Sequence, residues 1–205
     1  MARNLKPRHK ASRRFGENVA DTLKSPLDKG KTYPAGMHGQ KKTFSKTSEY
    51  GRQLLEKQKA KAIYGILEKQ FHLTFKKAQK LPGDLGSNLL LSLESRLDNV
   101  IFRSGLATTR RLARQLVTHG HFTLDGKKAA IPSMKVKAGQ VIKVKENKVK
   151  KGYWSALNER IDEIEPAGWL AFDKKELTIT INSLPSNDEM PKNIETQLII
   201  EFYSR

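Results

Sequence analysis

The chain has 205 residues, among them 39 Lys and Arg against 21 Asp and Glu, and its formal net charge is +18 at pH 7. An excess of this size destabilises a compact protein through self-repulsion unless a polyanion neutralises it, which points to nucleic acid as the partner. The absence of cysteine excludes disulfides and thiolate zinc sites, and no apolar run approaches the roughly 20 residues that span a bilayer.

Residues 1–48 are expected to form an extended, irregular basic arm. Gly, Pro, Ser, Thr and basic residues dominate this segment, and its few apolar residues cannot fold it alone, so it would order against a partner. Its basic residues are candidates for binding RNA, although a disordered tail that binds any polyanion would have the same composition. The candidates are Arg3, Lys6, Arg8, Lys10, Arg13, Arg14, Lys41, Lys42 and Lys46.

Residues 49–93 are expected to form a helical domain. Apolar residues recur at mostly helical spacing over 48–71, which predicts one long helix, and a shorter helix is expected over 73–81. Pro82-Gly83 would end the shorter helix. Basic residues fill much of the rest of the long helix, and its RNA-binding candidates are Arg52, Lys57, Lys59 and Lys61.

Two further helices carry recognisable boundary signals. The first is expected over about 89–103, with Asn88 as its N-terminal cap and Gly105 as the left-handed residue after its end. The second is expected to begin after Thr108 or Thr109, whose hydroxyl can accept a hydrogen bond from the first turn. Together they form a helix pair joined by a short turn.

Strands are expected over most of the remaining chain. The dipeptide Asp125-Gly126 lies between two short apolar segments and predicts a tight β-hairpin. Alternating or β-branched apolar residues predict four more strands, at 141–144, 169–172, 177–181 and 197–202.

The charge is distributed unevenly along the chain. Residues 1–52 hold 13 basic and 4 acidic residues, a net charge of +9, and residues 53–150 hold 20 and 7, a net charge of +13. Residues 151–205 hold 6 basic and 10 acidic residues, a net charge of −4. The first three quarters are therefore expected to face a polyanion, and the last quarter to serve packing or contacts with basic proteins.

The helix after Thr109 is the strongest candidate for a binding face. Arg110 and Arg114 lie four residues apart, so a helix projects both from one side, where guanidinium groups can hold phosphate bidentately. We expect this face to be solvated without RNA; a helix face with no partner, or a DNA-reading helix-turn-helix, would show the same pattern. The candidates are Thr109, Arg110, Arg111, Arg114, Gln115, His119 and, on the hairpin, Lys127.

No metal site or catalytic site is predicted. His119 and His121 lack further ligands nearby, so His119 is expected to cap the end of its helix or to contact RNA. The sequence contains no Gly-rich phosphate loop followed by Lys-Ser or Lys-Thr, and no arguable Ser-His-Asp arrangement.

Charged residues are also concentrated in the helix before Gly105. Glu94 and Asp98 share one helix face, which could suggest acid–base chemistry. Arg96 and Arg103 lie close to them in sequence and favour salt bridges instead. Both arginines are nevertheless RNA-binding candidates.

The segment Leu93–Gly105, LESRLDNVIFRSG, resembles the opening of the S-four RNA-binding domain, and residues 109–110, 113–119 and 124–127 fit its continuation. This domain occurs in ribosomal protein four of the small subunit and is also appended to RNA-modifying enzymes, transfer-RNA synthetases and a heat-shock protein. Outside the domain, residues 48–71, the arm and residues 195–205 resemble the bacterial form of that ribosomal family. The resemblance therefore extends over nearly the whole chain.

The resemblance implies an α+β fold. A mainly helical first domain would carry an inserted S-four domain, in which helices pack on a small β-sheet, and an extended basic N-terminal arm would precede both. The expected boundaries are an arm at 1–48, a helical domain at 49–93 completed by a C-terminal strand within 193–205, the S-four domain at 94–157, and a β-rich extension of that domain at 158–192.

The resemblance also implies a function. It implies a cytoplasmic structural constituent of the small ribosomal subunit that is not an enzyme and needs no cofactor. Such a protein is a primary binder of small-subunit ribosomal RNA and nucleates assembly of the subunit. Family members line the channel through which messenger RNA enters the subunit, contact small-subunit protein five and influence decoding accuracy, and some repress their own translation. Because the arm follows the family register from Met1, no transit peptide is expected.

The chain departs from the family pattern in its arm and near its end. Many members hold zinc with cysteines in the arm, so a chain without cysteine resembles a zinc-free variant. Lys6 stands where Gly is usual and Asn187 where Arg is usual. The alternatives are an RNA-modifying enzyme carrying an S-four domain and a DNA-binding regulator; the former lacks an arguable active site outside residues 94–157.

Overall fold

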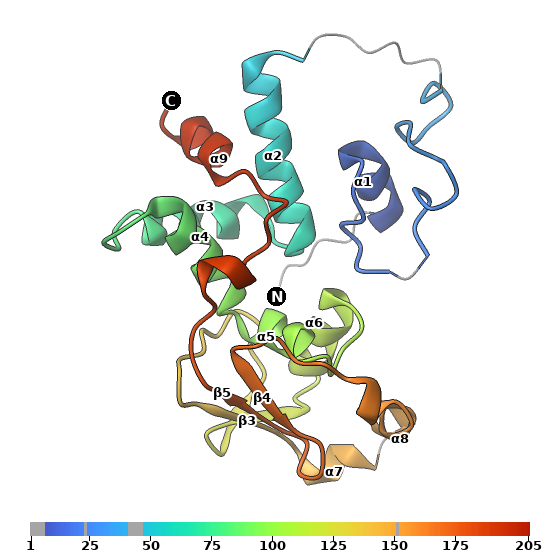
Figure 1. Cartoon of the computed structure of the whole chain (residues 1–205), viewed down its shortest axis with the longest axis vertical. Coiled ribbons are helices and arrows are strands. Elements are labelled where there is room, and N and C mark those ends of the chain that lie inside the picture. Colours follow the sequence, from blue (N-terminus) through green and yellow to red (C-terminus); the bar gives the residue numbers. More distant parts are fainter. Residues whose placement is uncertain (1–6, 23, 41–46, 151) are drawn as a thin grey trace. The chain divides into compact units, whose positions relative to one another are not determined.

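The computed structural model describes residues 7–22, 24–40, 47–150 and 152–205. The chain divides into two compact units, one formed by Met1–Leu89 with Pro191–Arg205 and the other by Leu90–Met190. Figure 1 shows helices in the first unit and a small sheet with helices in the second, in agreement with the predicted α+β class. Within the described ranges, no helix is long and apolar enough to cross a membrane.

The first unit consists of helices. They are α1 (Arg8–Phe15), α2 (Glu49–Ile63), α3 (Glu68–Ala78), α9 (Thr196–Tyr203) and the beginning of α4 (Leu85–Glu94), within which the division between the units falls. α4 begins a turn earlier than Leu89, where it was predicted, and Asp84 rather than Asn88 accepts a hydrogen bond in its first turn, from the Ser87 amide at 2.7 Å.

The single helix predicted over 48–71 is in fact two helices. The first of them, α2, begins where the sequence predicts a helix to start, and Ser48 caps it, since its Oγ accepts a hydrogen bond from the Gly51 amide at 3.2 Å. α2 ends at Ile63 because Gly65 adopts a left-handed conformation with φ of 62°, which terminates a helix. The helix predicted over 73–81 corresponds to the second half of α3, which ends at Ala78, three residues before the predicted end.

The prediction of a strand at 197–202 was wrong, because this segment lies in helix α9. Its apolar residues also fit a helical spacing, with Ile199 fully buried. α9 packs beside α2, as Figure 1 shows, where the rings of Tyr50 and Phe202 lie 5.7 Å apart between centroids. Ile, Leu and Phe favour strands, but packing on α2 and α3 overrides that weak preference.

The arm is more ordered than predicted. It contains α1, which packs against α2, and Arg13 of this helix holds the chain that follows. Arg13 donates from Nε to the Tyr33 carbonyl at 2.9 Å and from Nη2 to the Pro34 carbonyl at 3.1 Å, with its guanidinium 4.5 Å from the centroid of the Tyr33 ring. The described part of the arm thus closes on itself with no metal ligand among these contacts.

The second unit is built around a five-stranded antiparallel sheet. Its strands are β1 (Phe122–Leu124), β2 (Lys127–Ala129), β3 (Val141–Val144), β4 (Leu170–Asp173) and β5 (Thr178–Ile181), in the order β2-β1-β3-β5-β4. Helices α5 (Leu97–Arg103), α6 (Arg110–Thr118), α7 (Glu146–Val149) and α8 (Gly152–Asn158) and the short 3-10 helices at Ile161–Glu163 and Asn187–Glu189 complete it.

The hairpin turn follows the predicted chemistry. Asp125 and Gly126 have φ values of 48° and 77°, the pair of positive angles that a type I′ turn requires. The strands predicted at 141–144, 169–172 and 177–181 are confirmed as β3, β4 and β5, with bounds that differ by at most a residue at either end.

The helix predicted over 89–103 is broken at Arg96. This residue has an extended backbone, with φ of −74° and ψ of 138°, and it forms an isolated antiparallel bridge with Lys135. Leu97 donates to the Met134 carbonyl at 2.8 Å and Val136 donates to the Ser95 carbonyl at 2.9 Å. These long-range bonds replace the helical ones, so the break depends on a segment about 40 residues further along the chain.

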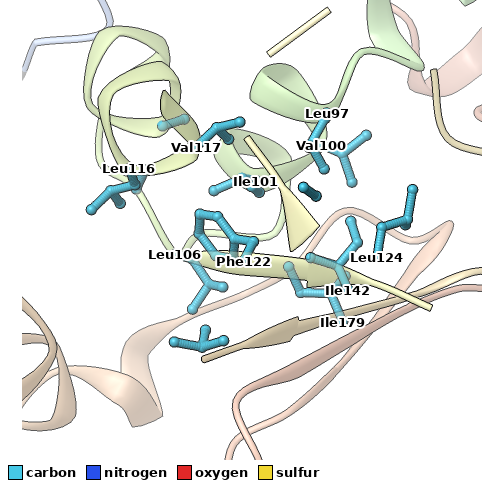
Figure 2. Packing of buried hydrophobic residues seen from close by; sticks show 14 of the residues in the cluster. Leu97, Val100, Ile101, Leu106, Leu116, Val117, Phe122, Leu124, Ile142 and Ile179 are labelled. Carbon is cyan, nitrogen blue, oxygen red and sulfur yellow. The ribbon is translucent and has the colours of Figure 1, made fainter. Parts of the chain in front are cut away.

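The core of the second unit lies between α5, α6 and one face of the sheet. Figure 2 shows the labelled side chains of these elements meeting there: Leu97, Val100, Ile101, Leu116, Val117, Phe122, Leu124, Ile142 and Ile179, all of them buried. Each such side chain contributes about 1.5–3 kcal/mol through burial. The core therefore fixes which side of α6 faces inward, and hence which side faces solvent.

Candidate RNA-binding surface

The start of α6 is fixed by its cap. Thr109 Oγ1 accepts a hydrogen bond from the Leu112 amide at 3.2 Å, so of the two predicted caps, Thr108 and Thr109, the structure confirms Thr109. The inward side chains of the helix are Ala113, Leu116 and Val117. Arg111 and Gln115, four residues apart, are exposed on another side, and Thr118 and His119 continue that exposed stripe.

Arg110 is not fully solvated, contrary to the prediction. It is half-buried, and its Nε donates to Oδ1 of Asn99 on α5 at 2.9 Å. Its guanidinium also lies 4.3 Å from the centroid of the Phe102 ring, within the range of a cation–π contact. Packing of α5 against α6 brings these three side chains together.

Arg114 is likewise drawn toward α5. Its Nη1 lies 3.5 Å from Oδ2 of Asp98, and 19% of its side chain is exposed. Asp98 also accepts two hydrogen bonds from Arg96, from Nε at 3.1 Å and from Nη2 at 2.8 Å. Both arginines of the predicted face thus contact α5, which a solvated helix face would not do.

The salt bridges predicted for Glu94 and Asp98 are confirmed. Glu94 is 1% exposed and accepts two hydrogen bonds from Arg103, both at 2.9 Å, and a third from Nδ2 of Asn99 at 2.6 Å. Such a carboxylate is costly to leave unpaired, so both of its partners are held firmly. This satisfied cluster supports a structural role rather than acid–base chemistry.

Arg96 requires a correction as an RNA-binding candidate. It is buried, at 7% exposure, and its guanidinium pairs bidentately with Asp98, because the extended backbone at the break directs it inward. Arg103 is partly exposed, at 25% of its side chain, while pairing with Glu94. We therefore leave Arg96 out of the proposed interface and keep Arg103 at its border.

The histidines do not form a metal site in the part of the chain that the structure describes. No group of three or more potential ligands is found there. His119 is exposed and is the C-terminal cap residue of α6, as predicted, while His121 is buried and its Nδ1 accepts a hydrogen bond from Trp154 Nε1 at 2.9 Å.

Lys127 on the hairpin is exposed, and so is its neighbour Lys128.

Two candidates on α2 also need correction, since they are buried. Lys57 Nζ lies 2.9 Å from Glu68 Oε1 and 4.0 Å from the centroid of the Phe202 ring. Lys59 Nζ lies 3.0 Å from Oε1 of Glu17 and 3.1 Å from Oε1 of Glu56. Both lysines hold the helices of the first unit together, so they too are left out of the proposed interface.

The neighbouring electrostatics agree with that assignment. Burial lowers the pKa of Lys59, but hydrogen bonds to Glu17 and Glu56 outweigh it, so the pKa is raised and the group stays charged. Lys61 is half-buried and pairs with Glu68, whereas Arg52 is exposed. Of the four candidates on α2, Arg52 is therefore the most accessible to a ligand.

The arm candidates fall into three groups. Arg13 is engaged with Tyr33 and Pro34, as described above, so its role is to hold the arm. Arg8 is half-buried, and Lys10 and Arg14 are exposed. The remaining candidates, Arg3, Lys6, Lys41, Lys42 and Lys46, lie outside the described residues.

The sequence does not reveal that Asn99 and Phe102 contact Arg110. Both residues lie on α5, eleven and eight residues before Arg110, and neither carries a charge that would single it out in the sequence. Helical spacing could place them on one side of α5, but only the packing of α5 on α6 shows that Arg110 meets them. Lys128, exposed beside Lys127 on the hairpin, extends the basic surface.

Two short helices packed on an antiparallel sheet, with basic side chains along the second helix and on the hairpin after it, define an RNA-binding domain of the S-four class. In agreement, a sequence model described as S4 domain matches residues 95–142, and one described as Ribosomal protein S4/S9 N-terminal domain matches residues 3–94.

Curated relatives agree over their entire length. Proteins named small ribosomal subunit protein uS4 are 44% identical in Roseiflexus castenholzii, 46% in Mycoplasmopsis synoviae and 47% in Geobacillus stearothermophilus, in each case over 100% of both chains. The chain therefore belongs to the uS4 family of small ribosomal subunit proteins, a family of structural proteins and not of enzymes.

Proposed function

We propose that this chain binds small-subunit ribosomal RNA through the outward side of α6 and the adjacent β1–β2 hairpin, in the cytoplasm. The observation that carries the proposal is the arrangement on α6. Arg111 and Gln115 are exposed on one stripe, while Arg110 and Arg114 lie beside it, held against α5. The hairpin adds Lys127 and Lys128, both exposed.

The chemistry of this surface suits folded RNA. An RNA helix presents phosphates and 2′-hydroxyls across a shallow groove, and its major groove is too narrow for side chains to read. Guanidinium and ammonium groups along one helix and one hairpin match phosphates at several positions rather than one set of base edges. The net charge of +13 over residues 53–150 provides the attraction.

We also propose the finer roles that the family resemblance implies. They are early binding to ribosomal RNA that nucleates subunit assembly, a contribution to the channel through which messenger RNA enters, an influence on decoding accuracy, and contact with small-subunit protein five. Lys41, Lys42 and Lys46 are the residues we assign to messenger RNA. The segment 151–205, with its net charge of −4, suits contacts with basic neighbouring proteins.

A competition titration tests the main proposal. The full-length chain is bound to labelled small-subunit ribosomal RNA and challenged with unlabelled RNA or duplex DNA, at several salt concentrations. We expect the RNA to compete far better than the DNA, and with roughly six to ten phosphate contacts the affinity should fall by about 10³–10⁵ between 50 and 200 mM salt. Equal competition by both nucleic acids would refute the proposal.

A further inference from the structure

We propose that Asn99 is a positioning residue for RNA binding, which acts by fixing the guanidinium of Arg110. The inference rests on the proposed function, since Arg110 is taken to be part of the RNA-binding surface. Asn99 itself is 3% exposed and cannot contact RNA. Its influence must therefore pass through the side chains that it bonds.

The amide of Asn99 joins two groups of opposite charge. Its Nδ2 donates to the Glu94 carboxylate, to Oε2 at 2.6 Å, and to the Glu94 backbone carbonyl at 3.2 Å. Its Oδ1 accepts from Nε of Arg110 at 2.9 Å. The reverse orientation would place oxygen against carboxylate and NH₂ against guanidinium, so the chemistry of the partners allows only one orientation.

Glu94, the residue on the other side of Asn99 from Arg110, is itself held in place. Glu94 is buried, and it also accepts two hydrogen bonds from Arg103. A carboxylate with three side-chain hydrogen bonds in a buried setting does not exchange partners at low cost. The hydrogen bonds to Glu94 thus fix the orientation of the Asn99 amide, so that its Oδ1 is a fixed acceptor for Arg110.

Arg110 is restrained from two directions. The hydrogen bond from Nε to Asn99 fixes the edge of the guanidinium. The Phe102 ring, whose centroid lies 4.3 Å from the guanidinium carbon, packs against its face. An arginine carries about 2 kcal/mol of side-chain rotamer entropy. Restraining it before RNA binds removes part of the entropy that binding would otherwise cost, which strengthens binding without a new contact.

Double-mutant cycles on the full chain test this inference, with transcribed small-subunit ribosomal RNA as the probe. Asn99→Ala should weaken RNA binding about three- to tenfold, the range expected when one rotamer-rich side chain is released. In an Arg110→Ala background, Asn99→Ala should change the affinity by no more than about twofold, the usual error of additivity. In an Arg111→Ala background it should keep its full effect.

Stability is measured in parallel, because Asn99→Ala could also loosen the fold. A structural role would lower stability and weaken RNA binding alike in all three backgrounds, and that result would overturn the inference, as would an Asn99→Ala variant that binds RNA normally. Phe102→Leu, at a partly exposed position, is the second variant should Asn99→Ala fail to fold. Its effect on affinity should also vanish in the Arg110→Ala background, and an effect that persists there would overturn the inference.

These outcomes are separable from failure of the proposed function. If the unaltered chain binds ribosomal RNA no better than duplex DNA, the proposed function fails. If it binds RNA specifically and Arg110→Ala weakens binding, but Asn99→Ala acts independently of Arg110, only the positioning role fails.

Discussion

The hydroxyl of Tyr203 donates a hydrogen bond to Oε1 of Glu68 at 3.0 Å, and this bond joins the last helix of the chain to a residue 135 positions earlier. Lys57 and Lys61 pair with the same carboxylate, and the Tyr203 ring also lies 4.5 Å from that of Phe75 between centroids. Burial and the neighbouring Glu68 raise the pKa of Tyr203, so it remains a donor at neutral pH. Glu68 is thus a point where α2, α3 and α9 meet.

This cluster predicts a specific dependence of stability on pH. Burial raises the pKa of Glu68, but hydrogen bonds from Lys61, Lys57 and Tyr203 outweigh it and lower the pKa from 4.5 to about 2. A lowered pKa in the folded state means that Glu68 stabilises the fold above pH 4.5 and loses this contribution as the pH falls toward 2.

The comparison of wild type with Glu68→Gln isolates that contribution. We expect the wild type to be more stable in urea unfolding at pH 7, and the difference to shrink steadily between pH 4.5 and 2. Because Glu68 is about half exposed, the difference should be modest and should decrease with salt. In a Tyr203→Phe background the stability difference that Glu68→Gln causes should be smaller, because one of the hydrogen bonds to the carboxylate is missing. A stability difference that stayed constant between pH 4.5 and 2 would contradict the account.

Arg110 and Arg114 should affect both RNA binding and stability. Replacing both with Ala removes the bonds to Asn99 and Asp98, and we expect this to cost about 1–3 kcal/mol of unfolding free energy as well as RNA affinity. The sequence alone predicts no stability loss, because it suggests a solvated face. Chemical denaturation and RNA titration of one preparation measure both effects.

The matched control is the exposed pair on the same helix. Arg111→Ala with Gln115→Ala should weaken RNA binding while changing stability by no more than about 0.5 kcal/mol, as is usual for exposed positions. If this pair left RNA affinity unchanged, the outward side of α6 would not be the binding face.

Arg13 should control order in the described part of the arm. Replacing it with Ala removes two hydrogen bonds to the Tyr33 and Pro34 carbonyls and the contact with the Tyr33 ring. We expect faster amide hydrogen exchange over residues 24–40 in Arg13→Ala, and little change in Arg14→Ala, whose side chain is exposed. Equal exchange in both variants would mean that other contacts hold the arm.

The lysines assigned to messenger RNA predict a translational phenotype. Neutralising Lys41, Lys42 and Lys46 together should leave subunit assembly largely intact and slow translation through structured messenger RNA, because these charges would bind the incoming strand. Sucrose-gradient profiles measure assembly, and translation of a hairpin-containing reporter measures passage. Defective assembly with normal passage would assign these lysines to ribosomal RNA instead.

Features set by local chemistry could be predicted from the sequence. The Thr109 cap, the Asp125-Gly126 turn and three strands of the sheet each depend on a few neighbouring residues, and all are confirmed. The breaks after Ile63 and at Arg96 were missed. The first depends on Gly65, whose left-handed conformation ends α2 although the apolar spacing continues past it, and the second on a bridge to Lys135 that no local pattern contains.

The site was predictable in kind but not in arrangement. The spacing of Arg110 and Arg114 correctly placed both on one side of a helix, yet it could not show that this side adjoins α5 while Arg111 and Gln115 face solvent. Nor could composition separate surface lysines from those buried in ion pairs, since Lys57 and Arg52 occupy the same basic helix. Burial is a property of tertiary packing, and a single sequence encodes it only indirectly.

Site-directed cleavage of the RNA tests the central claim most directly, because a chain without cysteine accepts a single tether. Iron-EDTA attached at Thr118→Cys, on the exposed stripe of α6, should cleave bound small-subunit ribosomal RNA at discrete nucleotides. The same tether at Glu163→Cys, an exposed acidic position of the second unit, should cleave weakly or not at all. Strong cleavage from position 163 with none from position 118 would contradict the account.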